Sequence, residues 1–119
     1  MKEVKNTITI GRPDKINKNS PQPDIPITGE GNSSVSRRQA TLSRTDRKGV
    51  YMLNDNGSSN GTYYKDGEKW IKADNSLVTT QTVVRFGYFE DTVGALVQLY
   101  NSLNPPIIAP DGNLIVFDF

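Results

Sequence analysis

The feature that most constrains the fold of this chain is a series of short, β-prone runs separated by turn residues. The run Thr7–Ile10 alternates polar and β-branched side chains before Gly11, and Gln39–Arg44 alternates in the same way. Such alternation is typical of strands that bury one face. At least eight runs of this kind recur at a spacing of roughly ten residues, which predicts a β-sandwich or barrel rather than a helical bundle.

Turn signals indicate how several of these runs pair. The five-residue connection Thr45–Gly49 predicts a hairpin between Gln39–Arg44 and Val50–Asn54, and Asp66-Gly67 predicts another. The segment Asp24–Ile27 is expected to form a short strand. Its proline cannot donate a ladder hydrogen bond, so this strand should lie at the edge of a sheet. Alternation over Ala95–Tyr100 predicts a further strand. Leu53 should alternate into the core, and Trp70 should pack on the sandwich.

Length and composition fit one domain with many turns. The chain has 119 residues, 34% of them hydrophobic, with ten glycines and seven prolines. We expect a β-sandwich domain over residues 1–104 and an apolar C-terminal extension over residues 105–119, packed on the domain or on a partner. No apolar run approaches the roughly 20 residues that span a bilayer, so direct membrane insertion is not expected. Because the N-terminus lacks the apolar core of a signal peptide, a cytoplasmic location is expected.

The chain contains no cysteine and no histidine. It therefore lacks thiol nucleophiles, a Ser-His relay and the usual ligands of zinc. The acidic residues form no recognisable acid/base pair, so we expect neither an enzyme nor a bound metal or cofactor. A net charge of +1 argues against a nucleic-acid-binding module, which would neutralise many phosphates.

One loop combines turn residues with groups that bind phosphate well. Asp55–Thr62 follows the apolar run Val50–Leu53 and precedes Tyr63-Tyr64, so it is expected to be an exposed tip held by two strands. Gly11-Arg12 ends the first predicted strand. In residues 1–52, which include this motif, basic side chains outnumber acidic ones. A local anion site is compatible with an almost neutral protein, since one phosphate needs only a few well-aimed donors.

These motifs occur together in a characteristic order. Gly11-Arg12 comes first, then Ser36-Arg37-Arg38-Gln39, then Ser59-Asn60-Gly61-Thr62, and finally Arg85-Phe86-Gly87. With them, the chain resembles a forkhead-associated (FHA) domain over about residues 7–100. The resemblance implies an all-β sandwich of two antiparallel sheets, about eleven strands in all, with loops at one end that bind a phosphothreonine peptide.

The resemblance assigns phosphopeptide contacts to five residues. Arg12 would hold the phosphate with forked N–H groups, which suit a dianion better than an ammonium does. The hydroxyl of Ser36 would donate to the phosphate, Ser59 would offer its backbone N–H, and Arg37 would add a further contact. The carboxamide of Asn60 can both donate and accept, so it would clamp the peptide backbone in extended form.

Three neighbouring residues are expected to brace the binding loops, whereas Arg38 is not assigned to the site. Arg38 should alternate to the other face of the chain. Gln39 stands where the family usually has a histidine that braces the binding loops, and a glutamine can also donate and accept hydrogen bonds. Gly57 and Gly61 are assigned to loop geometry.

The sequence thus favours a phosphothreonine-dependent module that binds a partner modified by a Ser/Thr kinase. The alternative is a phospho-independent, structural FHA-like domain of a bacterial secretion or envelope assembly. The apolar end Leu114–Phe119 is compatible with that alternative, because it could add a strand to another subunit and so support oligomerisation. A β-sandwich hydrolase or carbohydrate-binding module would need a catalytic pair or a row of aromatic side chains, and the sequence shows neither.

Overall fold

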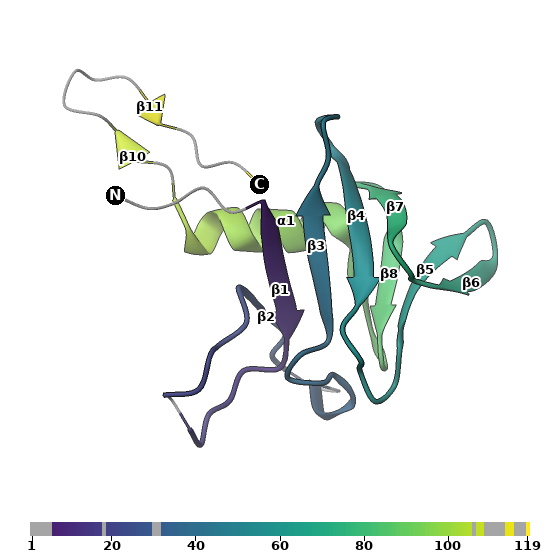
Figure 1. Cartoon of the computed structure of the whole chain (residues 1–119), viewed down its shortest axis with the longest axis horizontal. Helices are drawn as coiled ribbons and strands as arrows, with labels where there is room; N and C mark the ends of the chain where they lie inside the picture. Colours follow the sequence, from purple (N-terminus) through teal and green to yellow (C-terminus); the bar gives the residue numbers. More distant parts are fainter. Residues whose placement is uncertain (1–5, 18, 30–31, 106, 109–113, 116–118) are drawn as a thin grey trace.

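The computed structural model describes residues 6–17, 19–29, 32–105, 107–108, 114–115 and 119. Two β-sheets form a sandwich with one α-helix against it (Figure 1). The first sheet has the order β2-β1-β3-β4-β7, with strands β1 (Thr7–Gly11), β2 (Ile25–Pro26), β3 (Ala40–Arg44), β4 (Val50–Asp55) and β7 (Ser76–Thr79). The second has the order β6-β5-β8-β9, with strands β5 (Thr62–Asp66), β6 (Lys69–Lys72), β8 (Val83–Phe86) and β9 (Phe89–Thr92).

The predicted two-sheet β-sandwich is confirmed, with differences in strand number and direction. The two sheets contain nine strands rather than about eleven, and β10 (Ile107–Ile108) and β11 (Leu114–Ile115) pair separately as a two-stranded unit. All pairs within the two sheets are antiparallel except β1 with β2, which is parallel. The edge strand expected at Asp24–Ile27 is confirmed as β2, which lies at the edge of the first sheet.

Both predicted hairpins are also confirmed. Strands β3 and β4 pair antiparallel across the Thr45–Gly49 connection, and β5 pairs with β6 across Asp66-Gly67. The turn chemistry explains the second hairpin, because Gly67 adopts φ +62°, a conformation that favours glycine.

The core lies between the sheets and is built from alternate strand residues. Leu53 is fully buried, as its place in the alternation predicts. The other buried apolar strand residues share this inward orientation: Ile8, Ile10, Ile25, Ala40, Leu42, Tyr51, Val78, Val84 and Phe86. Burial of this apolar surface is the main force that fixes the strand register and, with it, the positions of the connecting loops.

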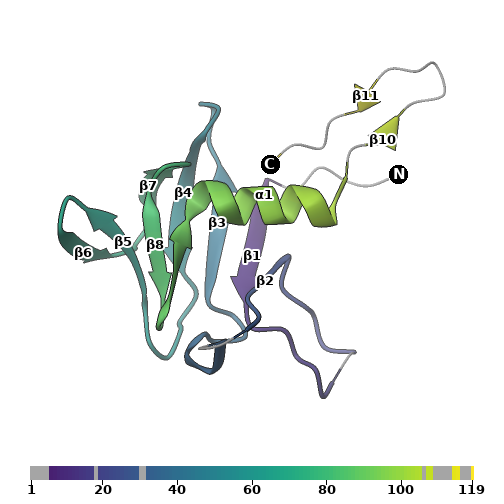
Figure 2. The same ribbon diagram turned by 180° about the vertical axis from the view of Figure 1, so that it is seen from behind.

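The strand expected at Ala95–Tyr100 is wrong, because this segment belongs to helix α1 (Val93–Leu103). Val93, Leu96, Val97 and Tyr100 are buried and follow the helical spacing of three and four residues. A short apolar window fits both the strand period of two and the helical period of 3.6. The helix start signal, here the N-cap Thr92, decides between them. The helix contacts β9, and it also contacts both outermost strands of the first sheet, β2 and β7, so that it crosses the sandwich (Figure 2).

Phe119 lies against the domain at the end of the sandwich opposite the loop between β4 and β5 (Figure 1). Its ring stacks on Tyr51 with 5.5 Å between centroids and meets the edge of Tyr100 at 5.7 Å. The Tyr51 hydroxyl donates to the backbone oxygen of Phe119 at 2.9 Å. Much of the 105–119 extension lies outside the described residues, so the boundary at residue 104 stays a prediction.

Candidate functional site

Three segments meet at one end of the sandwich, the lower end in Figure 1. They are the end of β1, the segment from 3-10 helix η1 (Asn32–Ser34) to Gln39, and the β4–β5 loop. Backbone hydrogen bonds join them: the N–H of Arg12 donates to Ser36 O at 3.0 Å, and the N–H of Gln39 donates to Ile10 O at 3.0 Å. The strand ends thereby bring residues from distant parts of the sequence to one edge.

Arg12 follows β1 and is fixed to the segment after η1. Its Nε donates to Val35 O at 3.1 Å, while its terminal nitrogens donate to none of the described residues. Gly11 permits this close approach of the two segments, because a Cβ at that position would lie 2.0 Å from the backbone oxygen of Arg37. The guanidinium is therefore oriented through one N–H, and its remaining donors face outward from the half-buried side chain.

Ser36 and Ser59 are in direct contact, although 23 positions separate them. The backbone N–H of Ser59 donates to Ser36 Oγ at 2.9 Å, which ties the β4–β5 loop to the η1 segment. The Ser59 N–H is thus bonded within the protein, and its contact with a phosphate stays a prediction. Within the described part of the chain the Ser36 hydroxyl donates to no acceptor, so its proton is available to a ligand.

Asn60 lies beside these groups on the exposed tip of the β4–β5 loop. Its Nδ2 donates to the backbone oxygen of Ser34 at 2.8 Å, which fixes the orientation of the carboxamide. Its Oδ1 accepts from none of the described residues. The side chain can thus offer an oriented acceptor, and a second Nδ2 proton, to a peptide backbone.

Gln39 is fully buried beneath the loops and bonds to each of them. Its Oε1 accepts from the N–H of Ser36 at 2.9 Å, and its Nε2 donates to Gly61 O at 2.8 Å and to Thr62 Oγ1 at 2.9 Å. All of its side-chain contacts therefore lie within the binding loops or at the start of β5. A buried amide with these partners holds the loops in one arrangement, since leaving any of these groups without a partner is costly.

The β4–β5 loop closes around Asp55. This carboxylate accepts hydrogen bonds from the N–H groups of Gly57 (3.1 Å) and Ser58 (3.2 Å), from the Ser58 hydroxyl and from Thr62 Oγ1 (2.7 Å). Partial burial tends to raise the pKa of Asp55, but the hydrogen bonds from Ser58, Thr62 and Gly57 outweigh it and lower the pKa. The predicted loop glycines Gly57 and Gly61 have φ +72° and +84°, so both adopt the left-handed conformation that favours glycine.

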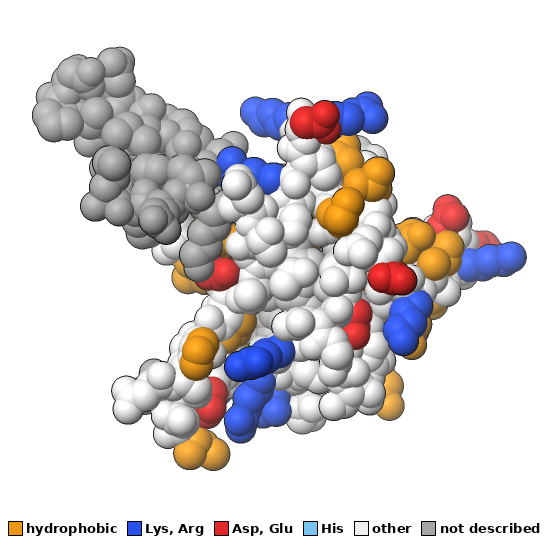
Figure 3. All heavy atoms as spheres, in the orientation of Figure 1, with side chains coloured by type: hydrophobic (Ala, Val, Ile, Leu, Met, Phe, Trp, Pro, Cys, Tyr) orange, Lys and Arg blue, Asp and Glu red, His pale blue; other side chains and the backbone are white. Residues whose placement is uncertain are grey.

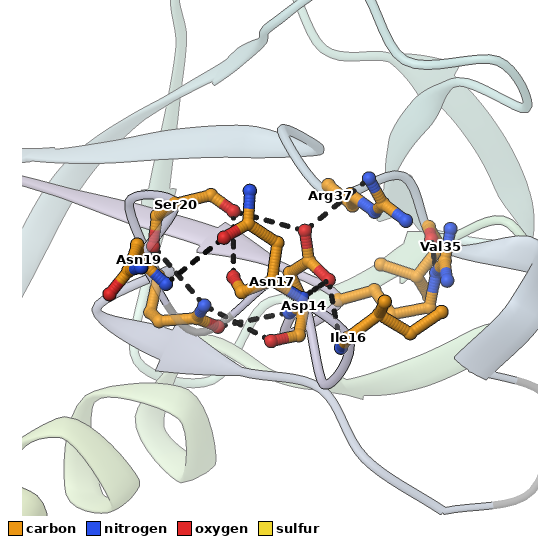
Figure 4. A network of polar contacts seen from close by, with 9 residues as sticks. Asp14, Ile16, Asn17, Asn19, Ser20, Val35 and Arg37 are labelled. Atoms are coloured by element: carbon orange, nitrogen blue, oxygen red, sulfur yellow. Dashed lines mark hydrogen bonds and ion pairs between the residues drawn. The ribbon is translucent and has the colours of Figure 1, made fainter.

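Arg37 makes an ion pair with Asp14 on the rim of the same end (Figure 4). The Nη1–Oδ2 distance is 3.5 Å, and the Arg37 side chain is 57% exposed whereas that of Asp14 is 9% exposed. Hydrogen bonds from the Asn17 N–H and the Ser20 hydroxyl, followed by a contribution from the charge of Arg37, lower the pKa of Asp14. Asp14 thus orders the loop after β1 and holds Arg37 near the site.

Two hollows flank Arg37. One, of about 320 Å³, is lined by the basic residues Arg12, Lys15 and Arg37. Asp14 and Ser33 also line it. The other, of about 260 Å³, is lined by Arg37 and Arg38. Figure 3 shows Lys and Arg side chains gathered at this end of the molecule. Arg38 therefore lines a different hollow from Arg12.

Sequence comparison identifies the family to which this arrangement belongs. A sequence profile of the FHA domain matches residues 8–87, which is more than half of the chain. The chain belongs to the FHA domain family. FHA domains are protein-interaction modules, and the matched region includes every residue named above at the three converging segments. A search of curated proteins gave no significant match.

Solved structures similar to this chain include three FHA domains. The FHA domain of the CT664 protein from Chlamydia trachomatis is 22% identical, with a TM-score of 0.50 over 76% of this chain and 75% of that one. The FHA-2 domain of the Mycobacterium tuberculosis ABC transporter Rv1747 is 26% identical, with a TM-score of 0.46 over 92% and 71%. The FhaA FHA domain, solved in complex with the intracellular domain of Rv3910, is 21% identical, with a TM-score of 0.46 over 76% and 81%.

Some residues that shape this FHA site were not identified from the sequence. Asp55 and Ser58 close the β4–β5 loop, and Asp14 orders the loop after β1. Each is a short polar side chain in a turn-rich segment, which is a signal for local side chain to backbone hydrogen bonds. Ser34 had no such signal, because its contacts with Asn60 and Tyr88 depend on the tertiary fold.

The described residues contain no group of three or more His, Cys, Asp or Glu side chains placed to hold a metal ion. Across those residues, too, no helix has the length and apolar character needed to cross a membrane.

Proposed function

We propose that this FHA domain binds a partner protein through a phosphorylated threonine. The observation that carries the proposal is the convergence of Arg12, Ser36 and Asn60 at one edge, held by hydrogen bonds from Arg12 to Val35 and from Ser59 to Ser36. These side chains supply a cation, a neutral donor and a backbone clamp. Together they match the chemical groups of a phosphorylated residue within an extended peptide.

The phosphate would be held by donors that need little rearrangement. Arg12 is already oriented through its Nε, so ordering its terminal nitrogens on the phosphate costs less side-chain entropy than it would for a free arginine. The hydroxyl of Ser36 accepts from Ser59 and keeps its proton for a phosphate oxygen. Arg37 would approach from the rim if the phosphate competes with Asp14 for its guanidinium.

The peptide backbone would be held by Asn60. Its Oδ1 can accept from a peptide N–H, while its Nδ2 already donates to Ser34 O and so fixes the plane of the carboxamide. Three or four charge-assisted hydrogen bonds of about 1.5–3 kcal/mol each are enough for micromolar affinity after ordering costs. In this role the domain is not an enzyme and acts in the cytoplasm. Its partner is a protein that a Ser/Thr kinase has phosphorylated.

The variants Arg12→Ala and Asn60→Ala test this proposal. A phosphothreonine peptide selected from a library with randomised flanks would be titrated into each variant by calorimetry. We expect each variant to bind the peptide at least about tenfold more weakly. Arg12→Ala loses a hydrogen bond to the charged phosphate, and Asn60→Ala loses the oriented clamp on the peptide backbone. Arg47→Gln is the matched control, since it removes one exposed arginine from the β3–β4 turn at the opposite end of the sandwich.

Unchanged affinity in Arg12→Ala, with binding equally tight to the unphosphorylated peptide, would contradict the proposal. That result would favour a phospho-independent structural domain instead. Circular dichroism spectra of all variants must match that of the wild type, so that a loss of binding reports on the site and not on unfolding.

A further inference from the structure

A hollow of about 250 Å³ lies beside Asn60, and it is separate from the hollow that Arg12 lines. Its lining residues are Asn60, Tyr63, Arg85, Gly87 and Tyr88. We name it the Arg85 hollow. Because Asn60 belongs both to this hollow and to the proposed peptide clamp, a peptide held by Asn60 passes directly over it. The occupant of the hollow is therefore expected to be another residue of the same peptide.

The β8–β9 turn that forms one wall is fixed to the binding loops. The N–H of Tyr88 donates to Ser34 Oγ at 2.9 Å, and the backbone oxygen of the same Ser34 accepts from Asn60 Nδ2 at 2.8 Å. The N–H of Gly87 also donates to Gly61 O at 3.4 Å. Ser34 thus links the turn to the clamp, so the Arg85 hollow keeps a defined position relative to the phosphothreonine site.

The guanidinium of Arg85 is held between two aromatic rings. Its Cζ lies 4.8 Å from the ring centroid of Tyr63 and 4.6 Å from that of Trp70. Contacts of this kind with aromatic rings do not use up the N–H groups of an arginine, which can still bind an acceptor. Among the described residues the Arg85 side chain makes no hydrogen bond or ion pair, even with Glu90, its cross-strand partner.

We propose that the Arg85 hollow binds the carboxylate of an Asp or Glu side chain of the bound phosphopeptide. Arg85 would bind both carboxylate oxygens, a geometry that its planar fork favours. The ring of Tyr88, whose residue is 87% exposed, would cover the methylene groups of the acidic side chain. The inference rests on the proposed function, and it adds that the domain selects phosphothreonine sites with an acidic residue nearby.

The test compares matched phosphothreonine peptides. An aspartate is scanned along both flanks of the phosphothreonine, and at the best position it is replaced by asparagine. We expect the aspartate peptide to bind wild-type protein about three- to tenfold more tightly than the asparagine peptide, as for a partly buried ion pair. Arg85→Gln should remove this preference while still binding both phosphopeptides, whereas the charge-matched control Arg47→Gln should keep it.

Trp70 provides a measurement on the unmodified protein, so the test does not depend on the folding of Arg85→Gln. It is the one tryptophan in the chain, and it stacks on Arg85. We expect the aspartate peptide at saturation to change the tryptophan emission more than the asparagine peptide does. Equal changes and equal affinities for the two peptides would overturn the inference.

The remaining outcomes separate this inference from the proposed function. Tight phosphothreonine binding with no acidic preference would overturn only the assignment of the Arg85 hollow. If a phosphoserine at the best position binds more tightly than aspartate, the hollow is a second phosphate site and the carboxylate assignment is wrong. If no phosphopeptide binds better than its unphosphorylated twin, both proposals fail.

Discussion

At the scale of single residues, one buried amide connects the parts of the binding end. Gln39 receives a hydrogen bond from Ser36 and donates to Gly61 and Thr62, so it links the two loops that carry the proposed phosphopeptide contacts. A carboxamide can do this because it has an acceptor and two donors on one rigid plane. The side chain makes these contacts without carrying any charge.

Replacing Gln39 with alanine should destabilise the fold. The change leaves the Ser36 N–H and the Gly61 carbonyl without their partner and opens a cavity, so we expect a loss of about 2–4 kcal/mol in the free energy of unfolding. Urea denaturation measures this loss. Gln98→Ala is the control, because Gln98 is exposed on helix α1 and should change stability little. Equal stability of the two variants would show that Gln39 does not brace the loops.

Asp55 gives the stability a defined dependence on pH. Its folded-state pKa lies below the ordinary value of 3.8, so its stabilising contribution is complete above that value and disappears as the pH falls through the lower folded pKa. Urea midpoints should therefore fall as the pH drops below 3.8, and Asp55→Asn should make this fall less steep. The slope should not vanish, because Asp14 also has a lowered pKa. An unchanged slope in Asp55→Asn would contradict this account.

At the scale of elements, the sequence predicted strands well where alternation coincided with turn residues. The hairpins β3–β4 and β5–β6 follow from Thr45–Gly49 and Asp66-Gly67, because both turns restrict the backbone locally. Helix α1 was missed, since apolar residues in a window of six satisfy both the period of two and the period of 3.6. Its burial against β2, β7 and β9 is a tertiary contact, which no local pattern specifies.

The start of helix α1 offers a test at this scale. Thr92 caps the helix, with its side chain accepting from the N–H of Ala95 at 3.1 Å. Thr92→Ala should lower the free energy of unfolding by about 1 kcal/mol, whereas Thr92→Ser should keep most of it. Thermal denaturation of the three proteins checks this prediction. Equal losses in the two variants would mean that the hydroxyl cap contributes little.

At the scale of the whole molecule, the proposed binding residues and the C-terminal aromatic contacts lie at opposite ends of the sandwich. Arg12, Ser36 and Asn60 lie at the loop end, whereas Phe119 packs on Tyr51 and Tyr100 at the other (Figure 1). The meeting of the three segments at one end could be predicted from the sequence, because their motifs follow strand ends in order. The hydrogen bonds between these segments, such as that from Ser59 to Ser36, could not, because they depend on how the strands pair.

This separation predicts that packing at the Phe119 end can be weakened without a change in binding. Phe119 is only 7% exposed, so Phe119→Ala should lower the free energy of unfolding by about 3 kcal/mol through loss of ring contacts and a new cavity. Phosphopeptide affinity measured well below the unfolding temperature should stay within about twofold of the wild type. A large loss of affinity in the folded variant would show that the two ends are coupled.

The central claim is that the converging loops recognise a phosphate on threonine. The most direct test is a calorimetric titration of the wild-type protein with one library-selected peptide in its phosphothreonine and unphosphorylated forms. We predict micromolar binding of the phosphorylated form and at least about a hundredfold weaker binding of its twin, since the twin lacks the charge-assisted hydrogen bonds. Equal affinity for the two forms would contradict the account.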